Sequence, residues 1–197
     1  MSPRIRRLAL PVVALAIGVA ALATAAWISF APRPGGGSAI SIGGPFALAG
    51  PDGRTVTDKD FAGTPFLVFF GFTHCPDVCP TKLFEISEVF RAMGDKGRDV
   101  RALFVTVDPE RDTPDVMKTY GQSFDPRIVG LTGDRAAIDK VIRDYRAYAR
   151  KVPTKDGDYT MEHTALVYLM GKDGRFVASF NVERAPAEAA QDLLRRL

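Results

Sequence analysis

The chain has 197 residues, and 46% of them are hydrophobic, which is enough apolar material for one well-packed domain and an accessory segment. Its formal net charge is +3, but four of the 26 basic residues and none of the 23 acidic residues precede residue 34. The remainder therefore carries 26 − 4 = 22 basic against 23 acidic side chains. This balance excludes a strongly basic face of the kind that binds nucleic acid.

Residues 8–30 contain no charged side chain, and a helix of that length covers about 30 Å, the hydrocarbon thickness of a bilayer. Three arginines in residues 1–7 favour a cytoplasmic N-terminus and export of the remainder. We therefore predict a cytoplasmic segment at 1–7 and a transmembrane anchor at 8–30. The alternative is a signal peptide that is cleaved at the small residues 23–25.

Residues 31–44 are rich in glycine, proline and serine, which predicts a flexible linker between the anchor and a folded domain at 45–197. The domain is expected to begin with a β-hairpin at 45–57, because apolar and β-branched residues flank a turn-forming sequence at 51–53. Residues 58–61 are predicted to form a short helical turn.

The apolar run at 65–70 is too short for a helix and rich in aromatic residues, so we predict a buried strand there. Apolar residues then recur at helical spacing from Pro80 to Phe90, and proline is well placed in the first turn of a helix. The two cysteines of the chain, Cys75 and Cys79, therefore lie on a strand-to-helix turn. Cys79 is near the helix start, where backbone N–H groups and the helix dipole favour a thiolate.

The rest of the chain alternates strands with helices. We predict strands at 100–107, 127–131, 164–170 and 176–180, helices that begin at Pro114, Asp134 and Pro186, and polar loops at 91–98 and 151–163. Strands that alternate with helices form a central sheet covered on both faces, so the predicted fold class is α/β. The closing β-β-α pattern, and cysteines that follow an early central strand, indicate a thioredoxin-like fold with an added N-terminal β-hairpin.

Two cysteines separated by three residues are compatible with several functions. A structural disulfide is one, but a loop this short gains little, because the stabilisation grows with the length of the closed loop. A redox pair or a clamp for a soft metal ion gains directly from the short spacing. The usual redox spacing is two residues, so this turn departs from an ordinary thioredoxin.

Three sequence motifs follow one another along the chain: GFTHCPDVCP at 71–80, VTVDPERDTP at 105–114 and DYTMEHTALVYLM at 158–170. In this order they strongly resemble the SCO (SCO/SenC) family of copper-binding cytochrome c oxidase assembly proteins. The resemblance runs from about residue 45 to the C-terminus, and the three motifs together are highly specific.

The resemblance implies that each chain binds one copper ion, Cu(I) or Cu(II), through Cys75, Cys79 and His163. Two thiolates and one imidazole select soft or borderline metals, which agrees with copper. Structural zinc usually has four protein ligands, and the sequence offers no convincing fourth. His74 matches the family motif but is not a family ligand, and Glu162 stands where the family commonly has aspartate.

The resemblance further implies a membrane-anchored metallochaperone that assists assembly of the dinuclear copper site in cytochrome c oxidase subunit II. Copper needs both cysteines reduced, so a thiol reductant is an implied partner, and another copper chaperone is a candidate source of the metal. The short basic N-terminus favours a bacterial inner membrane with the domain in the periplasm. The alternative is the mitochondrial inner membrane, with the domain facing the intermembrane space.

Two other functions remain open on the same residues. If the protein is an enzyme, it is a thiol–disulfide reductase in which Cys75 and Cys79 are the redox-active pair and reduce the cysteines of that client. A dithiol reductase does not need His163. A copper or redox sensor would use the same three ligands.

Three aspartates and one phenylalanine in the motifs each have two interpretations. Asp77, inside the cysteine turn, either tunes metal affinity by its charge or accepts hydrogen bonds from the loop. Asp108 and Asp112 follow a strand end, where functional loops gather, but a turn or capping role is equally expected. Phe72 either contacts a partner or packs in the core.

Overall fold

The computed structural model describes residues 17–24 and 41–197 of the chain. The chain forms two units, Met1–Ala39 and Ile40–Leu197, and the described residues of the first unit are helical. Most of the predicted anchor and linker therefore lies outside the described residues. Within the described ranges, no helix is both long and apolar enough to cross a bilayer.

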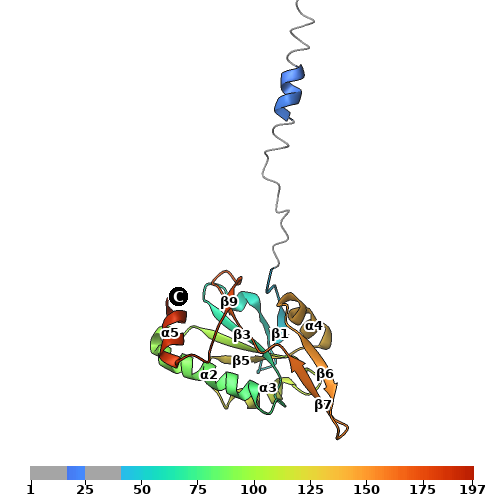
Figure 1. Ribbon diagram of the computed structural model, residues 1–197, viewed down its shortest axis with the longest axis vertical. Coiled ribbons are helices and arrows are strands. Elements are labelled where there is room, and N and C mark those ends of the chain that lie inside the picture. Colours follow the sequence, from blue (N-terminus) through green and yellow to red (C-terminus); the bar gives the residue numbers. More distant parts are fainter. Residues whose placement is uncertain (1–16, 25–40) are drawn as a thin grey trace, which may run out of the picture. The chain divides into compact units, whose positions relative to one another are not determined.

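A five-stranded sheet forms the centre of the second unit (Figure 1). Its strands are β3 (Phe66–Gly71), β4 (Arg101–Thr106), β5 (Ile128–Leu131), β8 (Val167–Met170) and β9 (Phe176–Ser179). Their order across the sheet is β5-β4-β3-β8-β9, with β3, β4 and β5 parallel and β8 and β9 antiparallel to their neighbours. The α/β class is thereby confirmed, and the predicted buried strand lies in the middle of the sheet.

Four helices of the second unit pack around the sheet. They are α2 (Val78–Met93), α3 (Pro114–Gly121), α4 (Arg135–Asp144) and α5 (Pro186–Leu194). Figure 1 shows α2 and α3 on one side of the sheet and α4 on the other, and α5 packs against α2. The starts of α3 and α4 are capped as their sequences predict, because Thr113 and Asp134 accept hydrogen bonds from backbone N–H groups of the first turn.

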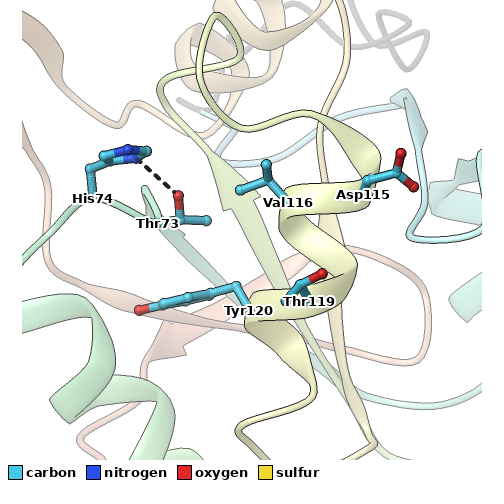
Figure 2. A pocket seen from close by; sticks show the side chains of 6 residues that line it. All are labelled: Thr73, His74, Asp115, Val116, Thr119 and Tyr120. Atoms are coloured by element: carbon cyan, nitrogen blue, oxygen red, sulfur yellow. Dashed lines mark hydrogen bonds between the residues drawn. The ribbon is translucent and has the colours of Figure 1, made fainter.

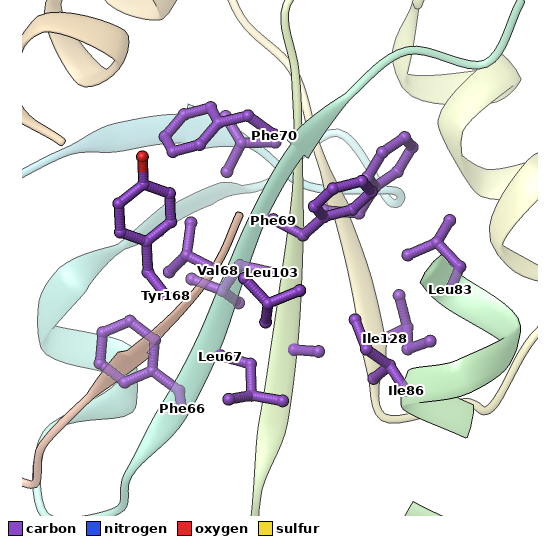
Figure 3. Close-up of a cluster of buried hydrophobic side chains, with 14 of the residues drawn as sticks. Phe66, Leu67, Val68, Phe69, Phe70, Leu83, Ile86, Leu103, Ile128 and Tyr168 are labelled. Atoms are coloured by element: carbon purple, nitrogen blue, oxygen red, sulfur yellow. The ribbon is translucent and has the colours of Figure 1, made fainter. Parts of the chain in front are cut away.

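The core is built on β3, which is buried on both faces along its whole length. Because side chains alternate across a strand, Phe69 faces the α2 side, where its ring stacks on that of Phe104 with centroids 6.0 Å apart. Phe70 faces the α4 side, where it meets the rings of Tyr145 and Tyr168. Figure 3 shows Phe70 and Tyr168 on one side of β3 and Phe69 on the other. Two apolar layers therefore hold the end of β3, where the cysteine turn begins.

The predicted N-terminal β-hairpin is confirmed as β1 (Ala47–Ala49) paired antiparallel with β2 (Thr55–Thr57). A bridge between Ala49 and Thr132 joins it to the rest of the domain. The predicted helical turn after it is a 3-10 helix, η1 (Asp58–Phe61).

The prediction of a loop at 151–163 is wrong. These residues form a second antiparallel hairpin, β6 (Ala149–Pro153) and β7 (Tyr159–His163). The sequence hides it because most of its side chains are polar and only Met161 is buried. The turn uses Gly157 at a φ of 87°, a backbone conformation that favours glycine.

Two further boundaries differ from the predictions. Helix α2 continues to Met93 and is followed by a 3-10 helix, η2 (Gly94–Gly97), where a polar loop from residue 91 was expected. The strand predicted from residue 164 begins only at Val167, so residues 164–166 connect β7 to β8. His163 therefore ends the hairpin of β6 and β7, called the outer hairpin below, and is separated from the core strand β8 by residues 164–166.

Candidate metal centre

The structure brings Cys75, Cys79 and His163 together from three places in the fold. Cys75 lies on the turn after β3, Cys79 in the first turn of α2, and His163 at the end of β7. One ligand atom from each residue lies within 4.8 Å of the other two. Both cysteines are free thiols. The three residues named from the sequence therefore form one cluster, and metal binding by this cluster stays a prediction.

Cys79 is fully buried, and its position depends on Gly71. A Cβ atom on Gly71 would lie 2.7 Å from Cys79 Sγ and 2.7 Å from Cε2 of Phe104. Any other residue at position 71 would therefore displace the sulfur or the ring. The last residue of β3 is a glycine so that the buried sulfur can pack directly on the backbone.

Cys75 is partly exposed at the mouth of the cluster. Its backbone N–H donates a hydrogen bond to the carbonyl of Phe72 at 3.2 Å, which closes the turn. The N–H of Cys79 in turn donates to Cys75 Sγ at 3.4 Å. This N–H group at the helix N-terminus has no partner within the helix, and it donates to the sulfur of Cys75 instead.

The expectation that the helix start favours a thiolate at Cys79 is wrong for the metal-free protein. Burial raises the pKa of the Cys79 thiol, and the charge of a neighbouring Cys75 thiolate would raise it further. Desolvation of the charged sulfur outweighs the favourable backbone groups. Cys79 is therefore held as a neutral thiol until something replaces its proton.

His163 presents one ring nitrogen to the sulfurs. Its Nδ1 lies 3.1 Å from the carbonyl oxygen of Thr164, and because a carbonyl oxygen only accepts, the ring proton sits on Nδ1. The lone pair of Nε2 then faces Cys79 Sγ at 3.5 Å. Burial lowers the pKa of His163, so the ring is neutral at pH 7, the form that binds metals.

The buried carboxylate of Asp112 holds the cysteine turn in place. It accepts hydrogen bonds from Thr73 through the backbone N–H at 3.1 Å and the hydroxyl at 2.6 Å. The hydroxyl of Thr106, at the end of β4, donates to the same group at 2.6 Å. The Asp112 side chain therefore has a structural role, because it holds the start of the cysteine turn against the end of β4.

The second motif also reaches the strand that carries His163. The buried carboxylate of Asp108 accepts hydrogen bonds from the guanidinium of Arg111 and from the hydroxyl of Tyr159 on β7. The Arg111 guanidinium lies 3.8 Å from the centre of the Tyr159 ring and donates to the Tyr159 carbonyl. The loop after β4 therefore ties the hairpin that ends in His163 to the sheet.

The remaining candidates lie outside the cluster. His74 is exposed, and its Nδ1 is 3.2 Å from the hydroxyl of Thr73. Asp77 is exposed at the start of α2 and makes no capping hydrogen bond through its side chain. Glu162 pairs with Arg150 across the outer hairpin at 2.8 Å. Sequence reasoning missed Tyr159 and Arg111 because the hairpin that joins them was not predicted.

Phe72 packs in the core, the second of the two interpretations. It is 2% exposed, and its ring meets the His163 ring edge-on with centroids 5.7 Å apart. The ring of Phe69 makes a similar contact with His163 at 6.3 Å. Two aromatic rings therefore fix the orientation of the imidazole and exclude water from one side of it.

Comparison with known proteins identifies the class to which this fold and cluster belong. The SCO1/SenC family model matches residues 35–197, so the chain belongs to the SCO1/SenC family. The structure of Bradyrhizobium japonicum ScoI with copper bound is 65% identical and covers 80% of this chain and 100% of that chain, with a TM-score of 0.77.

Two curated relatives show how far the similarity extends along the chain. The mitochondrial SCO1 homolog of Mus musculus is 43% identical over 152 residues, which is 76% of this chain and 54% of the relative. The SCO2-like protein RP587 of Rickettsia prowazekii is 34% identical over 185 residues, 90% of each chain. This chain thus spans about half the length of the mitochondrial relatives it matches.

The first prediction concerns Asp112. Replacing it by asparagine puts an N–H₂ group where an acceptor is needed, so we expect the free energy of unfolding to fall by about 1–3 kcal/mol. Urea titration followed by circular dichroism measures this. The exposed Asp115 serves as control, and its change to asparagine should cost clearly less. Equal losses for both variants would show that the carboxylate does not hold the turn.

The second prediction concerns thiol reactivity. In the reduced, metal-free protein, iodoacetamide should label Cys75 first, because Cys79 is buried and its pKa is raised. Each unit of raised pKa lowers the thiolate fraction about tenfold, so labelling of Cys79 should continue to accelerate above the pH range of an ordinary thiol. Peptide mass analysis over time separates the two sites, and unfolding in urea should equalise them. Faster labelling of Cys79 in the folded protein would contradict the assigned burial.

Proposed function

We propose that this chain binds one copper ion through Cys75, Cys79 and His163 and acts in the assembly of cytochrome c oxidase. The observation that carries the proposal is the convergence of two sulfurs and one neutral imidazole nitrogen within 4.8 Å. Family membership supports it, as does the copper in the related structures from Bradyrhizobium japonicum, Arabidopsis thaliana and yeast.

The donor set suits copper better than structural zinc. Thiolate and imidazole ligands are soft or borderline, as Cu(I) and Cu(II) prefer. Among the residues that the structure describes, no further histidine, cysteine or carboxylate joins these three as a fourth member of the cluster. Structural zinc sites usually have four protein ligands. Three ligands leave a coordination position open for a partner.

The burial of the ligands supports transfer of the metal to another protein. Cys75 and His163 are partly exposed, while Cys79 is fully buried. A thiolate of the acceptor can therefore reach the metal beside Cys75 and replace the ligands one at a time. We propose the dinuclear copper site of subunit II as the acceptor and a thiol reductant as the partner that keeps both cysteines reduced.

We also propose that residues 8–30 anchor the protein in a bacterial inner membrane and leave the domain at 45–197 in the periplasm. The uncharged sequence and the preceding arginines support this. A tether raises the local concentration of the copper protein near a membrane-bound acceptor. Alkaline carbonate extraction of the full-length protein should leave it in the membrane pellet, and its release into the supernatant would exclude an anchor.

A thiol–disulfide reductase is the second candidate, and the partly exposed Cys75 favours it. Its thiolate would attack a client disulfide, and Cys79 would then resolve the mixed disulfide, so that both electrons pass to the client and Cys75–Cys79 becomes a disulfide. The raised pKa of Cys79 works against the second step, because the thiolate is the attacking form. Such a reductase would have no use for the orientation of His163.

The fourth prediction tests the copper site in the full-length protein, purified in detergent, reduced and metal-free. Wild type should bind one copper ion per chain and show a thiolate-to-Cu(II) charge-transfer band. The variants Cys75→Ala, Cys79→Ala and His163→Ala should each lose tight binding, because each removes one of three ligands. Metal analysis after gel filtration and the absorption spectrum measure this.

The chain supplies a matched control in its second histidine. His74→Ala removes an imidazole next to Cys75 but outside the cluster, so its copper stoichiometry should equal that of wild type. Full binding by His163→Ala would exclude this ligand set. No tight copper in wild type, together with turnover of disulfide substrates that survives His163→Ala, would establish the reductase instead.

A further inference from the structure

The two imidazoles near the cysteine turn are supported very differently. His74 is exposed and lines an open, largely apolar cavity of about 450 Å³ between the turn and α3, where its Nδ1 lies 3.2 Å from the hydroxyl of Thr73 (Figure 2). His163 is partly buried and meets the rings of Phe69 and Phe72 edge-on. The position of His163 therefore depends on what holds these rings and the strand β7.

The strand that carries His163 has little attachment of its own. β6 and β7 contact each other far more than they contact any other helix or strand of the described residues, and Met161 is the one buried side chain of the outer hairpin. Tyr159, Met161 and His163 point to the same face of β7, because side chains alternate along a strand. A group that fixes Tyr159 from the domain therefore also orients the face that presents His163.

The guanidinium of Arg111 is the group that fixes Tyr159. Its Nε donates a hydrogen bond to the buried carboxylate of Asp108. Its Nη1 donates to the Tyr159 carbonyl at 3.1 Å, and its Cζ lies 3.8 Å from the centre of the Tyr159 ring. The Tyr159 hydroxyl donates in turn to Asp108 at 3.0 Å. One guanidinium therefore holds both the backbone and the side chain at the start of β7.

The same guanidinium also lies behind the aromatic wall of the imidazole. Its Cζ is 6.0 Å from the centre of the Phe72 ring, and that ring meets the His163 ring at 5.7 Å. Two short routes thus connect Arg111 to His163, one along β7 and one through a single ring. Nη2 of Arg111 is buried without a hydrogen-bond partner among the described residues, a cost that a lysine beside Asp108 would not carry. Both routes use the flat face of the guanidinium and not its charge alone.

We propose that Arg111 is a positioning residue of the metal centre, which holds the His163 imidazole with Nε2 toward the sulfurs and thereby sets how tightly the cluster binds Cu(II) relative to Cu(I). This inference rests on the proposed copper site. Thiolates suit the softer Cu(I), whereas nitrogen ligands contribute more to a site for Cu(II). An imidazole that loses its orientation therefore costs Cu(II) affinity more than Cu(I) affinity.

The variant Arg111→Lys tests the proposal, because it keeps a positive charge beside Asp108 and removes the flat group that contacts both rings. Cu(II) affinity of the full-length protein should fall about ten- to a hundredfold, the usual range for a residue that orients a metal ligand, and Cu(I) affinity should fall clearly less. Competition with a chelator selective for each oxidation state measures both. In the metal-free protein, hydrogen exchange of the β7 amides should become faster, while that of the β3 amides stays unchanged.

The variant Arg127→Lys is the matched control. Arg127 likewise pairs with a carboxylate, that of Asp125, and lies over an aromatic ring, that of Phe90, and its side chain is as buried as that of Arg111. It precedes β5 at the end of the sheet opposite the cysteine turn. Its replacement should lower the free energy of unfolding without changing either copper affinity or the exchange of β7.

Equal losses of Cu(II) and Cu(I) affinity in Arg111→Lys would show a general loosening and overturn the inference. Wild-type affinities for both ions would also overturn it, even if β7 exchanged faster, because Arg111 would then support the hairpin alone.

If Arg111→Lys does not fold, Tyr159→Phe decides, because it removes only the hydroxyl that reaches Asp108. It should give a smaller loss of the same kind, and an unchanged ratio of the two affinities would overturn the inference. Absence of copper binding in wild type would instead overturn the proposed function, and this inference with it.

Discussion

A buried carboxylate beneath the cysteine turn sets the geometry on which the rest of the site depends. Asp112 accepts hydrogen bonds from the backbone and side chain of Thr73 and from Thr106 at the end of β4. These bonds join the turn that follows β3 to the neighbouring parallel strand, and hydrogen bonds to a buried charge are strong. Cys75 and Cys79 therefore follow a turn whose start is rigid, and in the proposed copper site the metal would meet sulfurs that are already in place.

The third residue of the cluster, His163, reaches this turn through the outer hairpin, which needs its own support. His163 ends β7, a strand with little apolar surface to bury. The Arg111 guanidinium and the Asp108 carboxylate attach that strand to the loop after β4 through Tyr159. The loop between β4 and α3 thus positions both halves of the cluster, the sulfurs through one aspartate and the imidazole through the other.

Burial gives the cluster its chemical character. It keeps Cys79 protonated and His163 neutral in the metal-free protein, so the imidazole nitrogen is ready to bind and the buried sulfur is not. A soft metal ion that displaces the thiol proton removes this penalty, because the metal neutralises the thiolate charge. The partly exposed Cys75 and His163 form the open side of the cluster. The same burial that slows disulfide chemistry at Cys79 favours a bound metal.

The sequence by itself determined the α/β class, the central strand and the strand-to-helix cysteine turn, because hydrophobic period and turn chemistry are local properties. The resemblance of its three motifs to the SCO family then singled out Cys75, Cys79 and His163. The sequence did not reveal the β6–β7 hairpin, since polar strands carry almost no hydrophobic period. Nor could it decide that Asp112 lies beneath Thr73 or that Cys79 is held as a thiol. Hydrogen-bond partners and desolvation depend on which distant segments pack together, and only the tertiary structure settles that.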